Sequence, residues 1–156
     1  ESYRTPLLIS WPGVTKPGSV NKNIVSNLDF AETFLDAAGV KIPSDMQGES
    51  LVPLLKGNKV PGWRKEHYYH YYEYPAVHSV KRHYGISTER YKLIHFYYDI
   101  DEWELFDLQS DPMEMKNVYN DPAYDRVKKQ LHKRLTKIMK KYGDSDELAR
   151  SFLPSK

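Results

Sequence analysis

The sequence predicts an α+β fold in which a four-stranded antiparallel sheet carries one long C-terminal helix and follows a separate strand–helix segment. Three short runs rich in aromatic and β-branched residues succeed one another at 80–86, 90–98 and 104–108, which favours an antiparallel meander. A tyrosine-rich run at 66–74 supplies a fourth strand before them. Apolar residues then recur every three or four positions over 124–142, which predicts a helix packed on the sheet.

The N-terminal segment has the pattern of a layered α/β domain. Three consecutive apolar residues, Leu7 to Ile9, lie in the run 6–11, so both faces of a strand there should be covered, as in a parallel sheet. Pro12 and Gly13 end the run. Without neighbouring strands such a segment exposes apolar surface and open backbone groups, so we expect it to be disordered, paired with another molecule or prone to aggregate.

Two helices are expected after this strand. The first covers 29–38, because its apolar residues form one stripe, Ser26 or Asn27 can cap its N-terminus, and Gly39 is a left-handed residue of the kind that commonly ends a helix. The second is short and covers 50–55. The strand and the two helices together form the N-terminal part of the fold.

Glycine and proline mark a boundary after the short helix. Residues 57–62 have the composition of a linker, and the chain becomes rich in tyrosine beyond them. We therefore expect one unit over 1–57, a second over 63–143 and a tail over 144–156. The chain also begins without Met and enters an apolar run almost at once, which we interpret as a piece of a longer protein.

Composition narrows the classes of function. The chain has 156 residues and a formal net charge of +2, a balance that gives no general attraction to nucleic acid or membranes. It contains no cysteine, so disulfides and cysteine-based zinc sites are impossible. No apolar run approaches the ~20 residues that span a bilayer. The six histidines have no spacing typical of metal ligands, and we expect no protein metal site in this chain.

Four segments in succession resemble type I sulfatases, which depend on formylglycine. They are RTPLLISWPG at 4–13, SNLDFAETFLDAAG at 26–39, QGESLVPLLKG at 47–57 and the run at 90–112. The resemblance covers 4–143 and is closest in character to bacterial sulfatases that act on sulfated sugars, including N-acetylglucosamine-6-sulfatases. It implies that 1–57 is the C-terminal end of an α/β, alkaline-phosphatase-like catalytic domain and that 63–143 is the C-terminal subdomain.

The resemblance also implies a mechanism for a complete enzyme. In this family a Cys or Ser within Cys/Ser-x-Pro-x-Arg is oxidised to formylglycine, whose hydrate attacks sulfur while calcium and basic side chains neutralise the sulfate. The nearest match here, SWPGV at 10–14, ends in Val where Arg is required, and no Asp-Asp pair or Asp-His-Gly segment is present. We therefore expect no catalytic and no metal-binding residue here, and assign calcium and formylglycine to a missing N-terminal catalytic portion of the same protein.

The resemblance further implies that the C-terminal subdomain borders the substrate. The loop at 74–83 combines cations and hydrogen-bond donors with tyrosine rings, as recognition of a sulfated sugar requires. The candidate substrate-binding residues are His78, Arg82 and His83. His78 ranks first, because a histidine on a proline-containing loop is poorly placed for core packing; a solvated loop histidine is the alternative. For Arg82 the alternative is a structural ion pair, with Glu73 or Asp107 as its partner.

The long helix supports an alternative function. Its cations form one face and comprise Lys128, Lys129, Lys133, Arg134, Lys137, Lys140 and Lys141. A solvated outer face explains them, but a non-catalytic module that binds a polyanion or sulfated glycan would use the same face. Nucleic acid is disfavoured because no RNA-binding signature occurs on the strands. The family resemblance implies a periplasmic or extracellular location in a bacterium.

Overall fold

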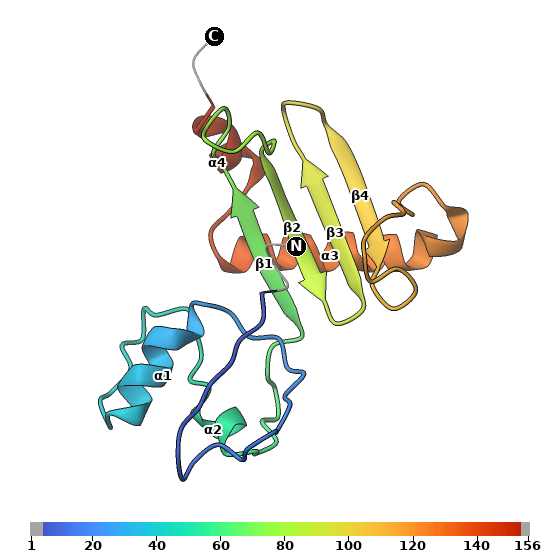
Figure 1. Ribbon diagram of the computed structural model, residues 1–156. Helices are drawn as coiled ribbons and strands as arrows, with labels where there is room; N and C mark the ends of the chain where they lie inside the picture. Colours follow the sequence, from blue (N-terminus) through green and yellow to red (C-terminus); the bar gives the residue numbers. More distant parts are fainter. Residues whose placement is uncertain (1–4, 154–156) are drawn as a thin grey trace. The chain divides into compact units, whose positions relative to one another are not determined.

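The computed structural model describes residues 5–153, and these form two compact units whose elements are labelled in Figure 1. The first unit ends at Arg64 and the second begins at Lys65. Each unit has a hydrophobic core of its own. Among the described residues, no helix is both long enough and apolar enough to cross a lipid bilayer.

The first unit contains two helices, α1 at Asp29–Ala37 and α2 at Val52–Leu55. Its core forms where Leu51 and Leu54 pack against Trp63. The indole N–H of Trp63 donates a hydrogen bond to the carbonyl of Ile24 at 2.8 Å, which satisfies the polar atom of this buried ring. The end of the unit is therefore fastened to the segment that leads into α1.

The N-terminus of α1 differs from the expected cap. Leu28 is the N-cap residue, and no side chain caps the helix there. The carboxylate of Asp29 instead turns back and accepts from the backbone N–H of Ser26 at 2.7 Å. The prediction that Ser26 or Asn27 caps this helix is therefore wrong. The other end agrees with the sequence, because Gly39 follows the helix with φ of 68°.

The expected strand over 6–11 is absent, and this prediction is wrong for the described residues. Residues 5–11 have no regular secondary structure, and Leu8 is 90% exposed. A strand needs neighbouring backbone to satisfy its N–H and C=O groups, and no described segment pairs with this one. Arg4, the first residue of this sulfatase-like segment, lies outside the described residues.

The second unit contains four antiparallel strands arranged in the order of the chain, as the sequence predicts. The strands are β1 at Glu66–Tyr71, β2 at His83–Thr88, β3 at Tyr91–Phe96 and β4 at Glu102–Asp107. Ile86 of β2 pairs with Leu93 of β3, which in turn pairs with Leu105 of β4. Because side chains alternate along a strand, these three residues point to the same face of the sheet.

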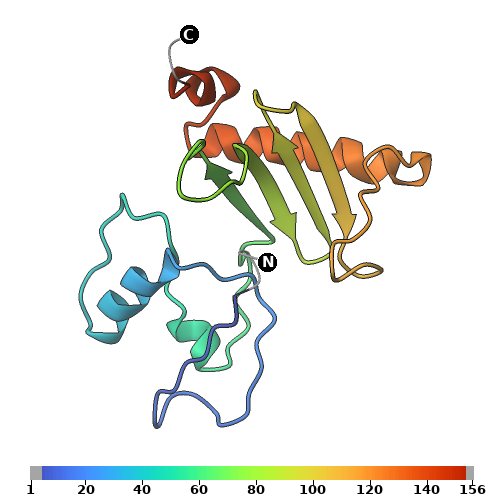
Figure 2. The ribbon, with the colours of Figure 1, turned by 45° about the horizontal axis from the view of Figure 1, so that its top comes forward.

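The remaining elements of the second unit are helical. They are a 3₁₀-helix at Pro122–Tyr124, α3 at Asp125–Lys141 and α4 at Asp146–Ser151, which forms within the expected tail. Figures 1 and 2 show α3 lying across one face of the sheet. The predicted α+β architecture, one long helix on a four-stranded meander, is therefore confirmed.

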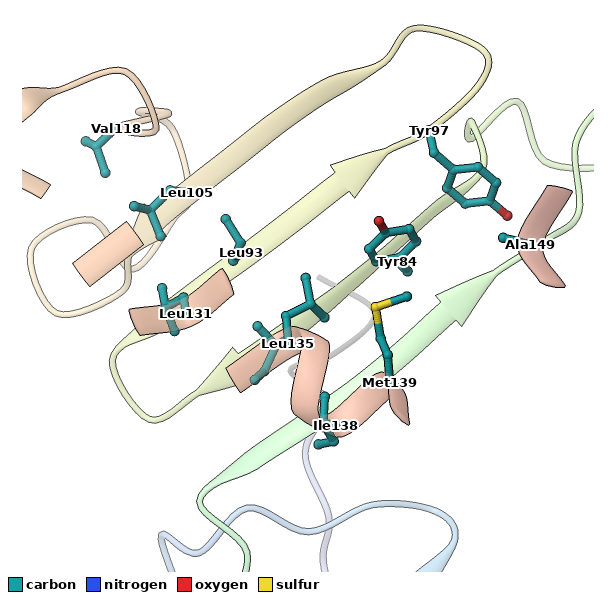
Figure 3. Packing of buried hydrophobic residues seen from close by; sticks show 11 residues of the cluster. Tyr84, Leu93, Tyr97, Leu105, Val118, Leu131, Leu135, Ile138, Met139 and Ala149 are labelled. Atoms are coloured by element: carbon teal, nitrogen blue, oxygen red, sulfur yellow. The ribbon is translucent and has the colours of Figure 1, made fainter. Parts of the chain in front are cut away.

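The main core lies between α3 and the sheet. Ile86, Leu93 and Leu105 are each 0% exposed. Leu131 and Leu135 of α3 belong to the same cluster, and Figure 3 shows them with Leu93 and Leu105. The apolar residues of α3, spaced three and four apart, form one face of the helix, and alternate residues of the strands form one face of the sheet. These two faces pack together, and each Å² of apolar surface buried between them contributes roughly 25 cal/mol to stability.

The tyrosines of β1 pack on both faces of the sheet. Tyr68 packs against the core under α3. Tyr69 points to the other face and belongs to a smaller cluster with Ile94 and Phe106. The tyrosines of β1 therefore serve as packing surface on both faces of the sheet.

Candidate functional site

The candidate loop connects β1 to β2 over residues 72–82, and a buried arginine holds its two ends together. Arg82 is 5% exposed. Its guanidinium donates to the backbone carbonyl of Tyr72 at 3.2 Å, to the carbonyl of Tyr74, and to the carboxylate of Asp99 at 3.2 Å. Because Asp99 lies in the β3–β4 turn, this one side chain joins the loop to the neighbouring hairpin.

The ion pair expected for Arg82 is present, but its partner is Asp99, not Glu73 or Asp107. The reason is the register of the sheet. The backbone N–H of Tyr97 donates to the carbonyl of Arg82 at 3.3 Å, which brings the β3–β4 turn beside the start of β2. Asp107 lies at the opposite end of β4, where its carboxylate binds the guanidinium of Arg90 at 2.8 Å.

A second cation–tyrosine contact lies at the base of the loop. The Lys81 ammonium is 3.7 Å from the centroid of the Tyr74 ring and donates to the Tyr74 hydroxyl. The guanidinium of Arg82 lies 5.8 Å from the same ring. Two cations thus lie near the Tyr74 ring, and they place positive charge beside the base of the loop.

The tip of the loop is open to solvent. Residues 75–80 are all exposed, and Val77 is 97% exposed. Within the described part of the chain, no hydrogen bond, ion pair or ring contact engages the side chain of His78. The loop, held at its base by Arg82, therefore exposes His78, and both ring nitrogens of this histidine are open to a ligand.

His83 has a different environment from His78. It lies on β2, 9% exposed, with its ring among those of Tyr69, Tyr71 and Phe96 at centroid distances of 5.6, 5.5 and 5.0 Å. Burial lowers the pKa of His83, although its hydrogen bond to the Lys81 carbonyl at 2.8 Å opposes this shift. A neutral His83 donates through Nδ1 to that carbonyl and supports the strand that carries the loop.

A buried histidine–aspartate network beneath the loop is not evident in the sequence. Asp144 follows α3, and its carboxylate accepts from the hydroxyl of Tyr68 at 2.5 Å and from His70 Nδ1 at 2.7 Å. The hydroxyl of Tyr97 lies 2.8 Å from His70 Nε2. The hydroxyl of Tyr72, at the start of the loop, donates to Asp144 at 3.4 Å. The network therefore ties β1, the residue that follows β3 and the α3–α4 connection together.

Burial sets the ionisation of this network. Desolvation lowers the pKa of His70 below its ordinary value, although the hydrogen bond and the charge of Asp144 oppose that shift. For Asp144 burial acts to raise the pKa, but hydrogen bonds from His70 and Tyr68 outweigh it, and the pKa is lowered. Burial and Asp144 raise the pKa of Tyr72 to about 12. The network is therefore a neutral imidazole beside a carboxylate, with tyrosines that stay protonated.

Two of the sulfatase-like segments meet in the first unit through the carboxylates of α1. Asp29 accepts from the backbone N–H of Glu49 at 2.9 Å and binds both terminal nitrogens of Arg64, at 2.8 and 2.5 Å. Glu32 accepts from the N–H of Gly48 at 2.6 Å. A Cβ atom on Gly48 would lie 2.2 Å from the Leu28 carbonyl oxygen, so only glycine fits there. The carboxylates of Asp29 and Glu32 therefore have a structural role.

The described residues do not offer a calcium site. No group of three or more His, Asp or Glu side chains among them is arranged to hold a metal ion. The most deeply buried carboxylates, those of Asp29 and Glu32, point at backbone N–H groups and, for Asp29, at Arg64. Calcium in proteins is held by six to eight oxygen ligands, usually including several carboxylates, and the described residues do not gather three carboxylate side chains at one place.

An apolar hollow of about 400 Å³ lies beside α1 in the first unit. Its lining includes Leu7, Leu8, Phe30 and Phe34. Leu8 and Phe34 are 90% and 71% exposed, which is unusual for such large apolar side chains in one contiguous patch.

Comparison with known proteins gives consistent matches along the chain. The model of the family described as N-sulphoglucosamine sulphohydrolase, C-terminal, matches residues 1–141. An N-acetylglucosamine-6-O-sulfatase of Bacteroides thetaiotaomicron is 54% identical over 148 residues, which are 94% of this chain and 26% of that enzyme. An ulvan-active sulfatase of Formosa agariphila is 30% identical, over 90% of this chain and 34% of its own length.

Solved structures share the fold. One protein, determined in complex with its substrate D-glucosamine-2-N,6-O-disulfate, superposes with a TM-score of 0.83 at 53% identity, over 87% of this chain and 28% of that chain. The phosphonate monoester hydrolase of Agrobacterium radiobacter superposes with a TM-score of 0.63 at 26% identity, over 76% of this chain and 25% of its own. The chain thus spans about a quarter to a third of the proteins it matches.

Proposed function

Since this chain belongs to the N-sulphoglucosamine sulphohydrolase C-terminal family, we propose that it is the C-terminal part of a sulfatase that hydrolyses sulfate esters of carbohydrates. The observation that carries the proposal is the 54% identity, over 94% of the chain, to an N-acetylglucosamine-6-O-sulfatase. The activity belongs to the whole protein, because the chain spans only 26% of that relative.

The proposed substrate is a glucosamine that carries a 6-O-sulfate and an N-acetyl or N-sulfate group. Two comparisons support this choice: the match to an N-acetylglucosamine-6-O-sulfatase, and the match to a structure determined with D-glucosamine-2-N,6-O-disulfate at 53% identity. Both compounds are amino sugars, and one is sulfated at two positions. A site for them needs a cation for sulfate and hydrogen-bond donors for ring hydroxyls.

In this proposal the loop at 72–82 contributes substrate contacts. His78 donates to a sugar hydroxyl or a sulfate oxygen, since its imidazole is exposed and engages no described residue. Arg82 and His83 remain candidates for contact. Their burial and internal hydrogen bonds support a positioning role, in which Arg82 fixes the base of the loop and His83 holds the strand behind it.

The proposed intramolecular partner of the first unit is an N-terminal catalytic portion of the same protein. The exposed Leu8 and Phe34 in the hollow beside α1 support such a contact, because burial of each large apolar side chain contributes roughly 1.5–3 kcal/mol. That portion would pair with the backbone of 6–11. In this proposal formylglycine and calcium reside in that portion, and for calcium this agrees with the described residues, which hold no group of three or more His, Asp or Glu side chains suited to a metal ion.

We also propose that the protein is exported to the periplasm or the cell exterior of a bacterium. The named relatives that support this come from bacteria, and one of them is an ulvan-active sulfatase. Polymeric sulfated substrates occur outside the cell. Fractionation of cells that express the full-length protein tests this location directly.

The substrate assignment is tested with the full-length protein on amino sugars that carry a single sulfate. We expect sulfate release from the 6-O-sulfated isomer and at least tenfold lower kcat/KM for the 4-O-sulfated isomer. His78→Ala should lower kcat/KM for the preferred isomer by roughly 10- to 100-fold, the loss of one hydrogen bond to a charged group. Ser79→Ala, at the neighbouring exposed position, is the control. Equal activity of both variants would remove His78 from the site.

A further inference from the structure

The outer face of α3 carries a regular row of lysines. Helix α3 contains eight cationic residues and one acidic residue, Asp125. Lys129, Lys133, Lys137 and Lys141 recur every four residues, and all four are exposed. At 1.5 Å per residue, neighbours in this row are about 6 Å apart along the helix axis, and the row is about 18 Å long.

The row is distinct from the cations that α3 uses internally. Lys128 binds the carboxylate of Asp125 at 2.9 Å, and Nε of Arg134 donates to Glu66 at 2.6 Å. Within residues 5–153, no carboxylate forms an ion pair with the four lysines of the row. The ammonium of Lys141 lies 5.0 Å from the Tyr142 ring centroid, a contact that leaves its charge uncompensated.

The spacing of the lysines in the row lowers the stability of the helix, and a role in solubility alone does not explain it. Like charges four residues apart repel one another, and a solvated helix face ordinarily alternates acidic and basic residues at this spacing. No acidic residue follows Asp125 within α3. An extended polyanion laid along the helix would relieve this repulsion at several lysines at once, since its charges repeat along one axis as theirs do.

We propose that the α3 lysine row, Lys129, Lys133, Lys137 and Lys141, is a binding surface for a sulfated polysaccharide. Lysine ammonium groups are point charges that bind sulfate without requiring one geometry. The row serves to hold the polymer, which raises the local concentration of its sulfated residues around the enzyme. The proposed sulfatase function is used here for one point, the choice of a sulfated carbohydrate as the polyanion.

The composition of this face favours a polysaccharide over other polyanions. The exposed residues of α3 are all polar or charged, so the face lacks the apolar side chains with which a helix enters a membrane surface. None of them is aromatic, so the bases of a single-stranded nucleic acid would find no ring to stack on within the helix. A sugar chain that presents sulfate groups needs neither feature.

Affinity chromatography and equilibrium binding of the full-length protein to heparin test the proposal. The variant is Lys129→Gln/Lys133→Gln/Lys137→Gln, and the matched control is Lys16→Gln/Lys41→Gln/Lys59→Gln, which removes the same charge from exposed positions of the first unit. We expect affinity to fall roughly tenfold to a hundredfold in the α3 variant, with elution at lower salt and a smaller slope against log salt. The control variant should elute with the unchanged protein.

Three further ligands separate the possible partners: heparin from which the sulfates have been removed, double-stranded DNA and vesicles of anionic phospholipid. We expect the unchanged protein to bind heparin more tightly than the other three ligands, and we expect the α3 variant to lose affinity for heparin. Equal loss in the control variant, or binding to DNA or vesicles as tight as to heparin, would overturn it. Because binding is measured without turnover, a protein that fails to hydrolyse sulfate esters leaves this result valid. Circular dichroism confirms that each variant folds.

Discussion

Replacement of Asp29 by alanine tests the structural role assigned to the carboxylates of α1. Asp29 is 0% exposed, and its carboxylate accepts from the N–H groups of Ser26 and Glu49 and binds Arg64 through two nitrogens. The variant leaves two backbone donors and one largely buried guanidinium without their acceptor. Removal of one partner of a buried ion pair costs roughly 3–5 kcal/mol, and this range includes the lost hydrogen bonds.

The assay for Asp29→Ala has a global and a local readout. Urea denaturation monitored by circular dichroism should show a free energy of unfolding that is lower by roughly 3–5 kcal/mol. Hydrogen exchange of the Glu49 amide should accelerate, because the amide loses its acceptor. Asp45→Ala, at an exposed acidic residue nearby, should change stability by less than about 0.5 kcal/mol. If Asp29→Ala behaved like this control, the carboxylate would not hold the two segments together.

Three further predictions concern stability and the loop. Gly48→Ala should destabilise the first unit by at least about 1–3 kcal/mol, since its Cβ would lie 2.2 Å from the Leu28 carbonyl, and unchanged thermal unfolding would show that the backbone relaxes freely. The pKa of His70 in the folded protein lies below the unfolded value of 6.5, so the unfolded chain binds more protons as the pH falls through that value. The free energy of unfolding should therefore decrease between about pH 7 and pH 5. His70→Phe should make that free energy, measured by urea denaturation, depend less on pH. Arg82→Gln should speed proteolysis within 72–82 without affecting cleavage elsewhere, because the loop loses its link to Asp99, and Asp99→Asn should do the same; unchanged cleavage would mean that other contacts hold the loop.

The four strands and α3 follow from local patterns. Alternation of aromatic and β-branched residues along each run indicates a strand, and apolar spacing of three and four indicates the helix. Both patterns depend only on neighbouring residues, so they are visible without the fold. The strand expected at 6–11 failed because burial of a parallel strand depends on other strands, and none pairs with it in the described chain.

The partners of buried polar residues could not be predicted in the same way. The sequence indicates that Arg82 needs an acidic partner, but the choice of Asp99 over Asp107 depends on the register of β2, β3 and β4. His70 and Asp144 are 74 positions apart, and only the packing of α3 on the sheet brings them to 2.7 Å. The exposed position of His78 was correctly expected from its loop, whereas its contact with substrate remains a prediction.

The most direct test of the account is the class of ester that the full-length protein hydrolyses. Phosphonate monoester hydrolases share this fold at 26% identity, so hydrolysis should be compared between an amino sugar 6-O-sulfate and an aryl phosphonate monoester. The account predicts release of inorganic sulfate with a kcat/KM at least a hundredfold above that for the phosphonate. Hydrolysis of the phosphonate alone, with no sulfate released from any sulfated amino sugar, would contradict it.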